Sequence, residues 1–166
     1  MDTFFEQIVK MKLSGKAIAV IAAIFFVDAA ILFFVFTLAA TVRASFLFII
    51  VMAVIYGTNK ILKQISVEYE YIFTNGDLDV DKIIGKSSRK RMVSVKCTNV
   101  EKYGDYQNGM AAPGSVKKTY FFCNADSENQ KYMIVKDKDE GIIMIVFAPD
   151  ERMQGAIEKY IPRLAM

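Results

Sequence analysis

The chain has 166 residues, of which 54% are hydrophobic and 23% charged, and its formal net charge is +3. Residues 1–63 hold six basic and three acidic side chains, whereas residues 64–166 hold fifteen of each. This balance in the longer part disfavours nucleic acid as a partner. The chain lacks His, and Cys97 and Cys123 form no Cys-x-x-Cys pair, which disfavours a metal site, a cofactor and a His-assisted nucleophile and suits a reducing cytoplasm.

Residues 1–16 show an amphipathic pattern. Thr3 and Glu6 have the spacing of a helix-capping box. The apolar side chains that follow fall mostly along one side of a helix; they are Phe4, Phe5, Ile8, Val9 and Met11. We expect an interfacial helix over residues 1–16 that leads into the membrane.

Two apolar runs follow in residues 17–62. The first, Ala17–Phe36, has the roughly 20 residues that a membrane span needs. The second is shorter, but Arg43 and Lys60 can extend their charges to the interfaces and lengthen it to about 43–60. Thr37–Val42 is then the turn of a transmembrane hairpin. A cleaved signal peptide and a buried hairpin of a soluble protein are the alternatives, and the length of the first run and the presence of the second favour a membrane hairpin.

The lysines predict how the hairpin is oriented. Three lysines precede the first span and two follow the second, whereas the turn side carries only Arg43; the lysines are Lys10, Lys12, Lys16, Lys60 and Lys63. Cytoplasmic ends of spans are enriched in basic residues. We therefore expect a multi-pass protein of the cell membrane with both termini in the cytoplasm.

Asp28 lies near the middle of the first span, where an acid costs about 2.5–3.5 kcal/mol and marks a candidate functional site. At its depth the second span is expected to place Phe48–Met52, which offers no polar side chain. Asp28 is therefore protonated, paired with a second copy, or paired with another membrane protein. Small residues on the same span offer a surface for close helix approach; they are Ala19, Ala22, Ala23 and Ala30.

The remainder of the chain is patterned as strands. Apolar residues alternate with Glu68 and Glu70 in Ser66–Phe73, which predicts a strand with one wet face. Asn75-Gly76 predicts a hairpin turn into a second strand containing Leu78 and Val80. Further strands are expected at about residues 90–95, 99–103, 118–123, 130–136 and 142–147, and a helix at about 149–161.

The aspartates of the second strand, Asp77, Asp79 and Asp81, have the spacing of a calcium loop. Such a loop also needs Gly at position 82 and an acid at position 88, where Lys and Ser stand. We therefore expect no calcium there.

One stretch of fifteen residues is basic and contains no acid; its charged side chains are Lys82, Lys86, Arg89, Lys90, Arg91 and Lys96. Its position soon after the membrane exit allows contact with anionic headgroups, worth about 1 kcal/mol per residue near the surface. A solvated hairpin tip is the other interpretation. A second candidate surface is the loop over residues 104–116, where Tyr106 and Met110 are candidates for binding, unless the loop is only a mobile connection.

The segments YIFTNGDLDV, SRKRMVSV and NVEKYG, placed between two short spans and a terminal helix, resemble bacterial pleckstrin-homology-like (PH-like) domains attached to membrane hairpins. The start MDTFFEQIVKMK and the stretch EYEYIFTNGDLDVDKIIGKSSRKRM are similar to a family of small Gram-positive membrane proteins with a domain of unknown function. The resemblance implies a seven-stranded antiparallel β barrel or sandwich over residues 64–166, capped by the last helix. It brings no catalytic residues.

The chain is therefore predicted to be an α+β membrane protein. We expect a non-enzymatic binding or scaffolding module held at the cytoplasmic face, which rests partly on the resemblance. One alternative is a module that senses anionic lipid, with Lys86, Arg89, Lys90 and Arg91 facing the membrane. Another is an accessory subunit of a transport or secretion complex, or a homo-oligomer, in which Asp28 makes the contact.

Overall fold

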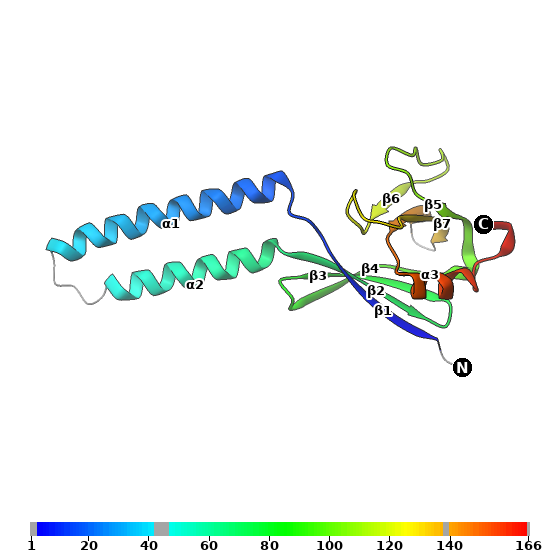
Figure 1. The fold of residues 1–166 in the computed structure, drawn as a ribbon, viewed down its shortest axis with the longest axis horizontal. Helices are drawn as coiled ribbons and strands as arrows, with labels where there is room; N and C mark the ends of the chain where they lie inside the picture. Colours follow the sequence, from blue (N-terminus) through cyan, green and yellow to red (C-terminus); the bar gives the residue numbers. More distant parts are fainter. Residues whose placement is uncertain (1–2, 42–46, 138–139, 166) are drawn as a thin grey trace. The chain divides into compact units, whose positions relative to one another are not determined.

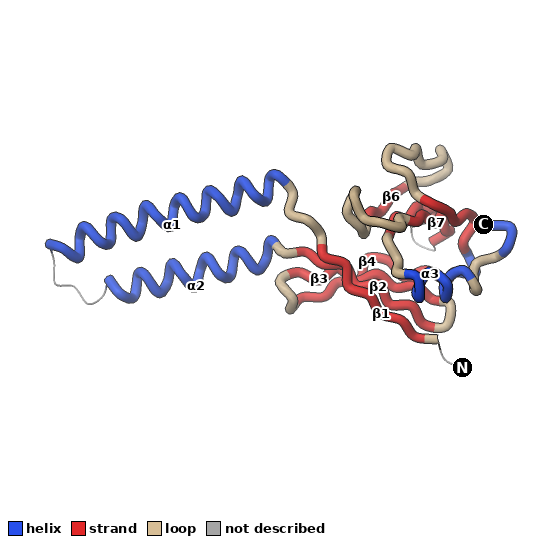
Figure 2. Tube along the Cα trace, in the orientation of Figure 1, coloured by secondary structure: helices blue, strands red, loops and turns tan. Residues whose placement is uncertain are grey.

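The structure, a computed structural model, describes residues 3–41, 47–137 and 140–165. It divides into two compact units. One unit comprises the residues up to Met11, Val67–Ile83 and the chain from Ser87 onward, and the other comprises Lys12–Ser66 with Ile84–Lys86. The first is built from strands and a short helix, and the second from two long helices (Figures 1 and 2).

The helical unit contains α1 (Gly15–Thr41) and α2 (Leu47–Ile65). Ser14 caps α1, because its Oγ accepts a hydrogen bond from the Ala17 amide at 3.2 Å. The less exposed residues of α1 recur at intervals of three and four, as in a pair of packed helices; they are Ala17, Ile21, Ile24, Asp28, Ile31, Val35 and Leu38. The less exposed residues of α2 are Val51, Val54, Gly57, Thr58, Leu62 and Ile65.

Both helices have the length and composition of membrane spans, over Gly15–Leu38 and Phe48–Ile65. The expected turn at Thr37–Val42 is wrong, because α1 continues to Thr41. The Thr37 hydroxyl donates to the Phe34 carbonyl at 2.8 Å, so this polar side chain is satisfied within the helix. Val42 lies outside the described residues.

The β unit contains two four-stranded sheets. The first has the order β1-β2-β3-β4, with β1 (Phe4–Lys10), β2 (Val67–Thr74), β3 (Asp77–Ile84) and β4 (Ser88–Lys96). The second has the order β5-β7-β8-β6, with β5 (Val100–Asp105), β6 (Lys118–Phe121), β7 (Lys131–Asp137) and β8 (Gly141–Phe147). Asn75 and Gly76 have φ angles of 49° and 96°, as a two-residue hairpin turn requires.

The expected N-terminal interfacial helix is wrong, because residues 4–10 form strand β1, paired antiparallel with β2 from Phe4↔Thr74 to Lys10↔Glu68. Phe5 and Val9 pack against the core while Phe4 and Ile8 are exposed, so the apolar residues follow the strand period. The domain therefore begins before the helices rather than at residue 64, and the hairpin is inserted between its first two strands.

The expectation of seven antiparallel strands is wrong in two respects. The described residues form eight strands, because β1 joins the first sheet, and β6 pairs with β8 in parallel. Strand β7 is antiparallel to β8 on the other side of it. The nine residues between β6 and β7 carry the chain across β8, as a parallel pair requires.

The main core lies between the sheets and beneath α3 (Glu151–Glu158). Its largest fully buried side chains include Tyr71, Phe73, Phe122 and Phe147. The expected helix at 149–161 is shorter, since Asp150 caps it by accepting from the Met153 amide at 2.7 Å. Its buried side chains Met153, Ala156 and Ile157 face the core.

Candidate binding surfaces

The two arginines of the basic segment form ion pairs on the sheet. Arg89 Nη1 lies 2.8 Å from Glu70 Oε2, and Arg91 contacts Asp79 at 2.7 Å and Asp81 at 2.8 Å. The sequence did not reveal these pairs, because the basic segment contains no acid and the acids lie on β2 and β3. Both arginines are therefore engaged in ion pairs with acids of the sheet and do not form a free cationic patch.

The expected wet face of β2 is wrong, because Glu68 and Glu70 are buried. Burial raises the pKa of Glu70, the nearby Glu6 carboxyl raises it further, and Arg89 partly opposes the shift. Glu70 is thus a buried acid whose ion-pair partner, Arg89, is exposed. Asp81 is also buried and is held by Arg91.

The lysines of the basic segment are less engaged. Lys86, Lys90 and Lys96 are exposed and Lys82 is half-buried. Lys86 lies in the β3–β4 turn with φ of 60°, a left-handed conformation that is uncommon for Lys. This turn adjoins the end of α2: the Gly85 amide donates to the Ser66 carbonyl at 3.1 Å, and a Cβ on Gly85 would lie 2.9 Å from the Lys63 carbonyl oxygen. Lys86 therefore lies beside the last turn of a candidate span.

Asp28 has a partner that the sequence did not predict. The Thr58 hydroxyl donates to Asp28 Oδ2 at 2.6 Å, joining α1 to α2. The expectation that Phe48–Met52 face Asp28 is wrong. Because α1 continues to Thr41, the chain turns back later, and Asp28 faces a later residue of α2, Thr58. Asp28 therefore has a bond within this chain.

The predicted contact alanines Ala19, Ala22 and Ala23 do not share a surface with Asp28. At 3.6 residues per turn, Ala19 and Ala23 lie nearly opposite Asp28, and Ala22 lies about a third of a turn from it. All three alanines are exposed. They form an open side of α1, separate from the contact with α2.

The loop after β5 is partly packed. Tyr106 is half-buried against a second cluster on sheet β5-β7-β8-β6, and its ring lies edge-on to Phe121 at 5.9 Å. The Asn108 amide donates to the Ala125 carbonyl at 2.7 Å. Of the two predicted contact residues, Met110 is exposed and Tyr106 is held by the fold.

A groove of about 670 Å³ beside the start of β1 was not predicted from the sequence. Its lining residues are Thr3, Phe4, Phe5, Glu151, Arg152, Gly155, Ala156, Lys159 and Tyr160. A signal for it was present in Gly155, a glycine inside an amphipathic helix. Such a glycine costs about 0.8–1 kcal/mol relative to Ala and calls for a reason.

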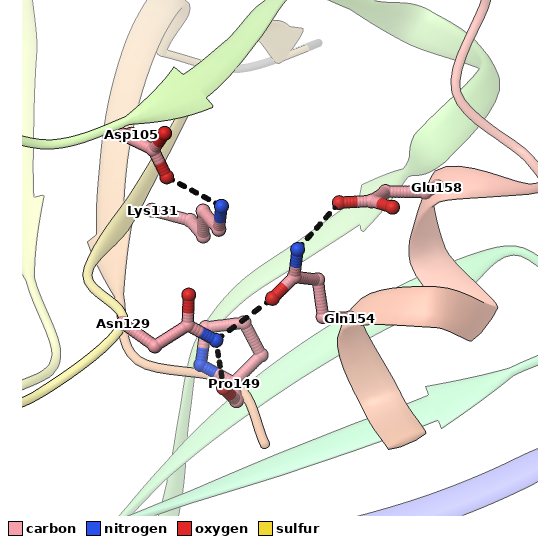
Figure 3. Close-up of polar contacts among 6 residues, drawn as sticks. All are labelled: Asp105, Asn129, Lys131, Pro149, Gln154 and Glu158. Carbon is pink, nitrogen blue, oxygen red and sulfur yellow. Dashed lines mark hydrogen bonds and ion pairs between the residues drawn. The ribbon is translucent and has the colours of Figure 1, made fainter. Parts of the chain in front are cut away.

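Polar contacts fix α3 beside this groove. The Asn129 amide donates to the Pro149 carbonyl at 3.0 Å and to Gln154 Oε1 at 2.7 Å, and Gln154 in turn donates to Glu158 at 2.7 Å (Figure 3). Lys131 and Asp105 form an ion pair beside them (Figure 3). From β1, the Gln7 side chain bonds both the Ala148 carbonyl and the Asp150 amide. The groove therefore has ordered walls on both sides.

The cysteines are buried as thiols, and burial raises the pKa of Cys97 to about 12 and that of Cys123 to about 11. Among the described residues, no group of three or more His, Cys, Asp and Glu side chains is placed to hold a metal ion.

Comparison with known proteins gives one match. No curated protein and no solved structure matches the chain. The family model described as "Bacterial PH-like domain (DUF6106)" matches residues 1–166. The match covers β1 and both helices as well as the strands that follow them. The chain belongs to this family of bacterial PH-like domains.

Proposed function

We propose that the protein is a membrane-anchored binding or scaffolding module and not an enzyme. The observation that carries this proposal is the exposed apolar surface of α1 and α2. Phe26 is 78% exposed, Phe33 72% and Phe48 69%. Burying such a side chain is worth about 1.5–3 kcal/mol, so a bilayer is the favourable surrounding for these helices.

The proposed topology places both termini and the β unit in the cytoplasm. It rests on the excess of lysines at the ends of the helices that adjoin β1 and β2. Alkaline carbonate washing should leave the full-length protein in the membrane pellet. In a background with Cys97 and Cys123 replaced by Ser, an impermeant maleimide should label Arg43→Cys from outside intact cells but not Ser127→Cys. Release by carbonate would contradict the anchor, and labelling of Ser127→Cys would contradict the topology.

Binding of anionic lipid is a second candidate, favoured because the β3–β4 turn that contains Lys86 adjoins Lys63 through Gly85. Phosphate-bearing headgroups lie at the depth where a span ends, and each lysine near an anionic surface contributes about 1 kcal/mol. We expect native mass spectrometry of protein released from mixed zwitterionic and anionic nanodiscs to show retained anionic lipid. Lys63→Gln with Lys86→Gln should reduce the retention, whereas Lys90→Gln with Lys96→Gln should not. Equal retention in both double variants would remove this candidate.

An accessory role in a larger membrane complex is a third candidate, favoured by the open alanine side of α1. Small residues allow close helix approach. Ala19→Leu with Ala23→Leu should then reduce the mass of the complex extracted in mild detergent, while Val20→Leu with Val27→Leu leaves it unchanged. An unchanged mass in the alanine variant would contradict a contact on this side.

A further inference from the structure

We infer that the edge of β1 and the groove beside it form a docking site for an extended peptide segment of another protein, one that carries acidic side chains. The inference rests on the proposed binding function and assigns it a surface and a class of partner. It uses residues of the β unit alone.

Strand β1 is the edge of its sheet, since β2 is its one paired neighbour among the described strands. Met11 bonds Val67 through its amide at 3.0 Å, and Thr3 accepts from the Asn75 amide at 3.0 Å. Odd-numbered residues of β1 therefore direct their backbone groups to β2. In an antiparallel ladder the alternate residues point the other way. The N–H and C=O groups of Phe4, Glu6 and Ile8 consequently face outward, as a template for an added strand.

The middle and the C-terminal end of β1 already bond other segments of the chain, which limits the site to the N-terminal end of the strand. The Asn124 side chain donates to the Lys10 carbonyl at 2.9 Å, and the Gln7 amide group ties the middle of β1 to the segment before α3. The groove adjoins the other end, beside Thr3, Phe4 and Phe5. An added strand would thus pair with Phe4 and Glu6 and turn alternate side chains into the groove.

The chemistry of the groove indicates what the segment carries. The less exposed residues of its lining include the apolar Phe5, Ala156 and Tyr160, and Phe4, which also lines it, is 60% exposed. Arg152 and Lys159 line it, and neither takes part in an ion pair among the residues that the structure describes. Glu151 is the one acidic residue in this lining, so the groove carries more positive than negative side chains. An extended segment with an apolar residue for the apolar side chains and carboxylates for Arg152 and Lys159 fits this lining.

Gly155 keeps the groove open. It is exposed on α3, and a Cβ built on it meets no atom within 4 Å. No neighbouring atom of the described chain therefore requires a glycine at this position of the helix. Because a Cβ at this position meets no atom and Gly155 lines the groove, we expect a large side chain here to occupy the groove, which provides a selective test.

The probe is a phage-displayed library of random nonapeptides, selected against the full-length protein in nanodiscs. We expect enriched peptides that alternate apolar residues with Asp or Glu. The affinity of the best synthetic peptide should fall at least tenfold for Gly155→Phe, for Arg152→Glu with Lys159→Glu, and for a peptide N-methylated at alternate residues. Gly114→Phe is the matched control, because Gly114 also has no atom within 4 Å of a built Cβ and lies outside the groove. It should leave affinity unchanged.

Glu6→Pro tests the backbone pairing directly, because it removes an N–H that faces outward. It should weaken the peptide at least tenfold relative to Glu6→Ala, with the unfolding transition of both variants monitored. Selection without enrichment, enrichment that survives Gly155→Phe, or a dimer that Gly155→Phe dissociates would each overturn the inference, the last in favour of a second copy at this edge. Carbonate extraction and lipid retention are separate readouts, so such a failure leaves the membrane anchor standing.

Discussion

Replacing Tyr71 with Phe tests how the two sheets are joined. The Tyr71 hydroxyl donates to the Phe122 carbonyl at 2.7 Å and accepts from the Ala148 amide at 3.4 Å. The side chain is fully buried, so water does not replace the lost hydroxyl. A buried group left without its partner costs about 1–3 kcal/mol. Because the Ala148 contact is long, we expect Tyr71→Phe to lower the free energy of unfolding by about 1–3 kcal/mol in total.

The assay is thermal unfolding of the full-length protein in detergent micelles, followed by near-ultraviolet circular dichroism. For a domain of this size, each kcal/mol shifts Tm by about 4 °C. Tyr69→Phe is the matched control, since Tyr69 is half-buried, packs on Phe122 at 5.0 Å and has no hydrogen-bond partner for its hydroxyl among the described residues. It should change Tm by less than about 2 °C. Equal shifts in the two variants would refute the proposed link between the sheets.

Three further predictions concern charge, thiols and helix pairing. The pKa of Glu70 is raised in the folded protein, so its carboxyl favours folding at low pH, and this contribution is lost as pH rises above the ordinary pKa of 4.5. Glu70→Gln should therefore stabilise the protein more at pH 7.5 than at pH 4.5 in denaturant titrations. An equal gain at the two pH values would contradict the burial argument. Cys97 and Cys123 should react with iodoacetamide at pH 7.5 only upon unfolding, so rapid labelling of the native protein would refute their burial. Thr58→Val should weaken pairing of α1 with α2 by about 0.6–2 kcal/mol in a steric-trapping assay, whereas Thr37→Val, whose hydroxyl bonds its own helix, should not.

Strands β2 to β8 and the terminal helix were predictable because their signals are local. Apolar periodicity and the Asn75-Gly76 turn each act within a few residues, so each can be recognised in a single sequence. Strand β1 was not, because its apolar residues fit both a helix and a strand. Its partner β2 lies on the far side of two long helices in the sequence, and pairing along seven residues decides between the two periods.

The candidate sites failed for a related reason. Arg89 and Arg91 stand in a segment without acids, yet the fold brings Glu70, Asp79 and Asp81 to them across the strands. Local charge therefore overstated the free positive surface. The groove between β1 and α3 joins residues more than 140 positions apart, and Gly155 was its one local sign.

The position of the helices within the chain leads to a final prediction. The hairpin is inserted between Met11 and Val67, which are bonded neighbours in the β1–β2 ladder. A hydrogen-bonded antiparallel pair is the geometry that a two-residue turn closes, and Asn-Gly favours that turn. Replacing residues 12–66 with Asn-Gly should therefore give a water-soluble protein in which the β unit remains folded, with the Tyr71→Phe destabilisation retained. Truncation to residues 64–166 should instead give an unstable domain, because it removes β1 and uncovers the β2 edge. If the truncated chain is as stable as the Asn-Gly variant, β1 is not part of the folding unit and its assignment to the domain is wrong.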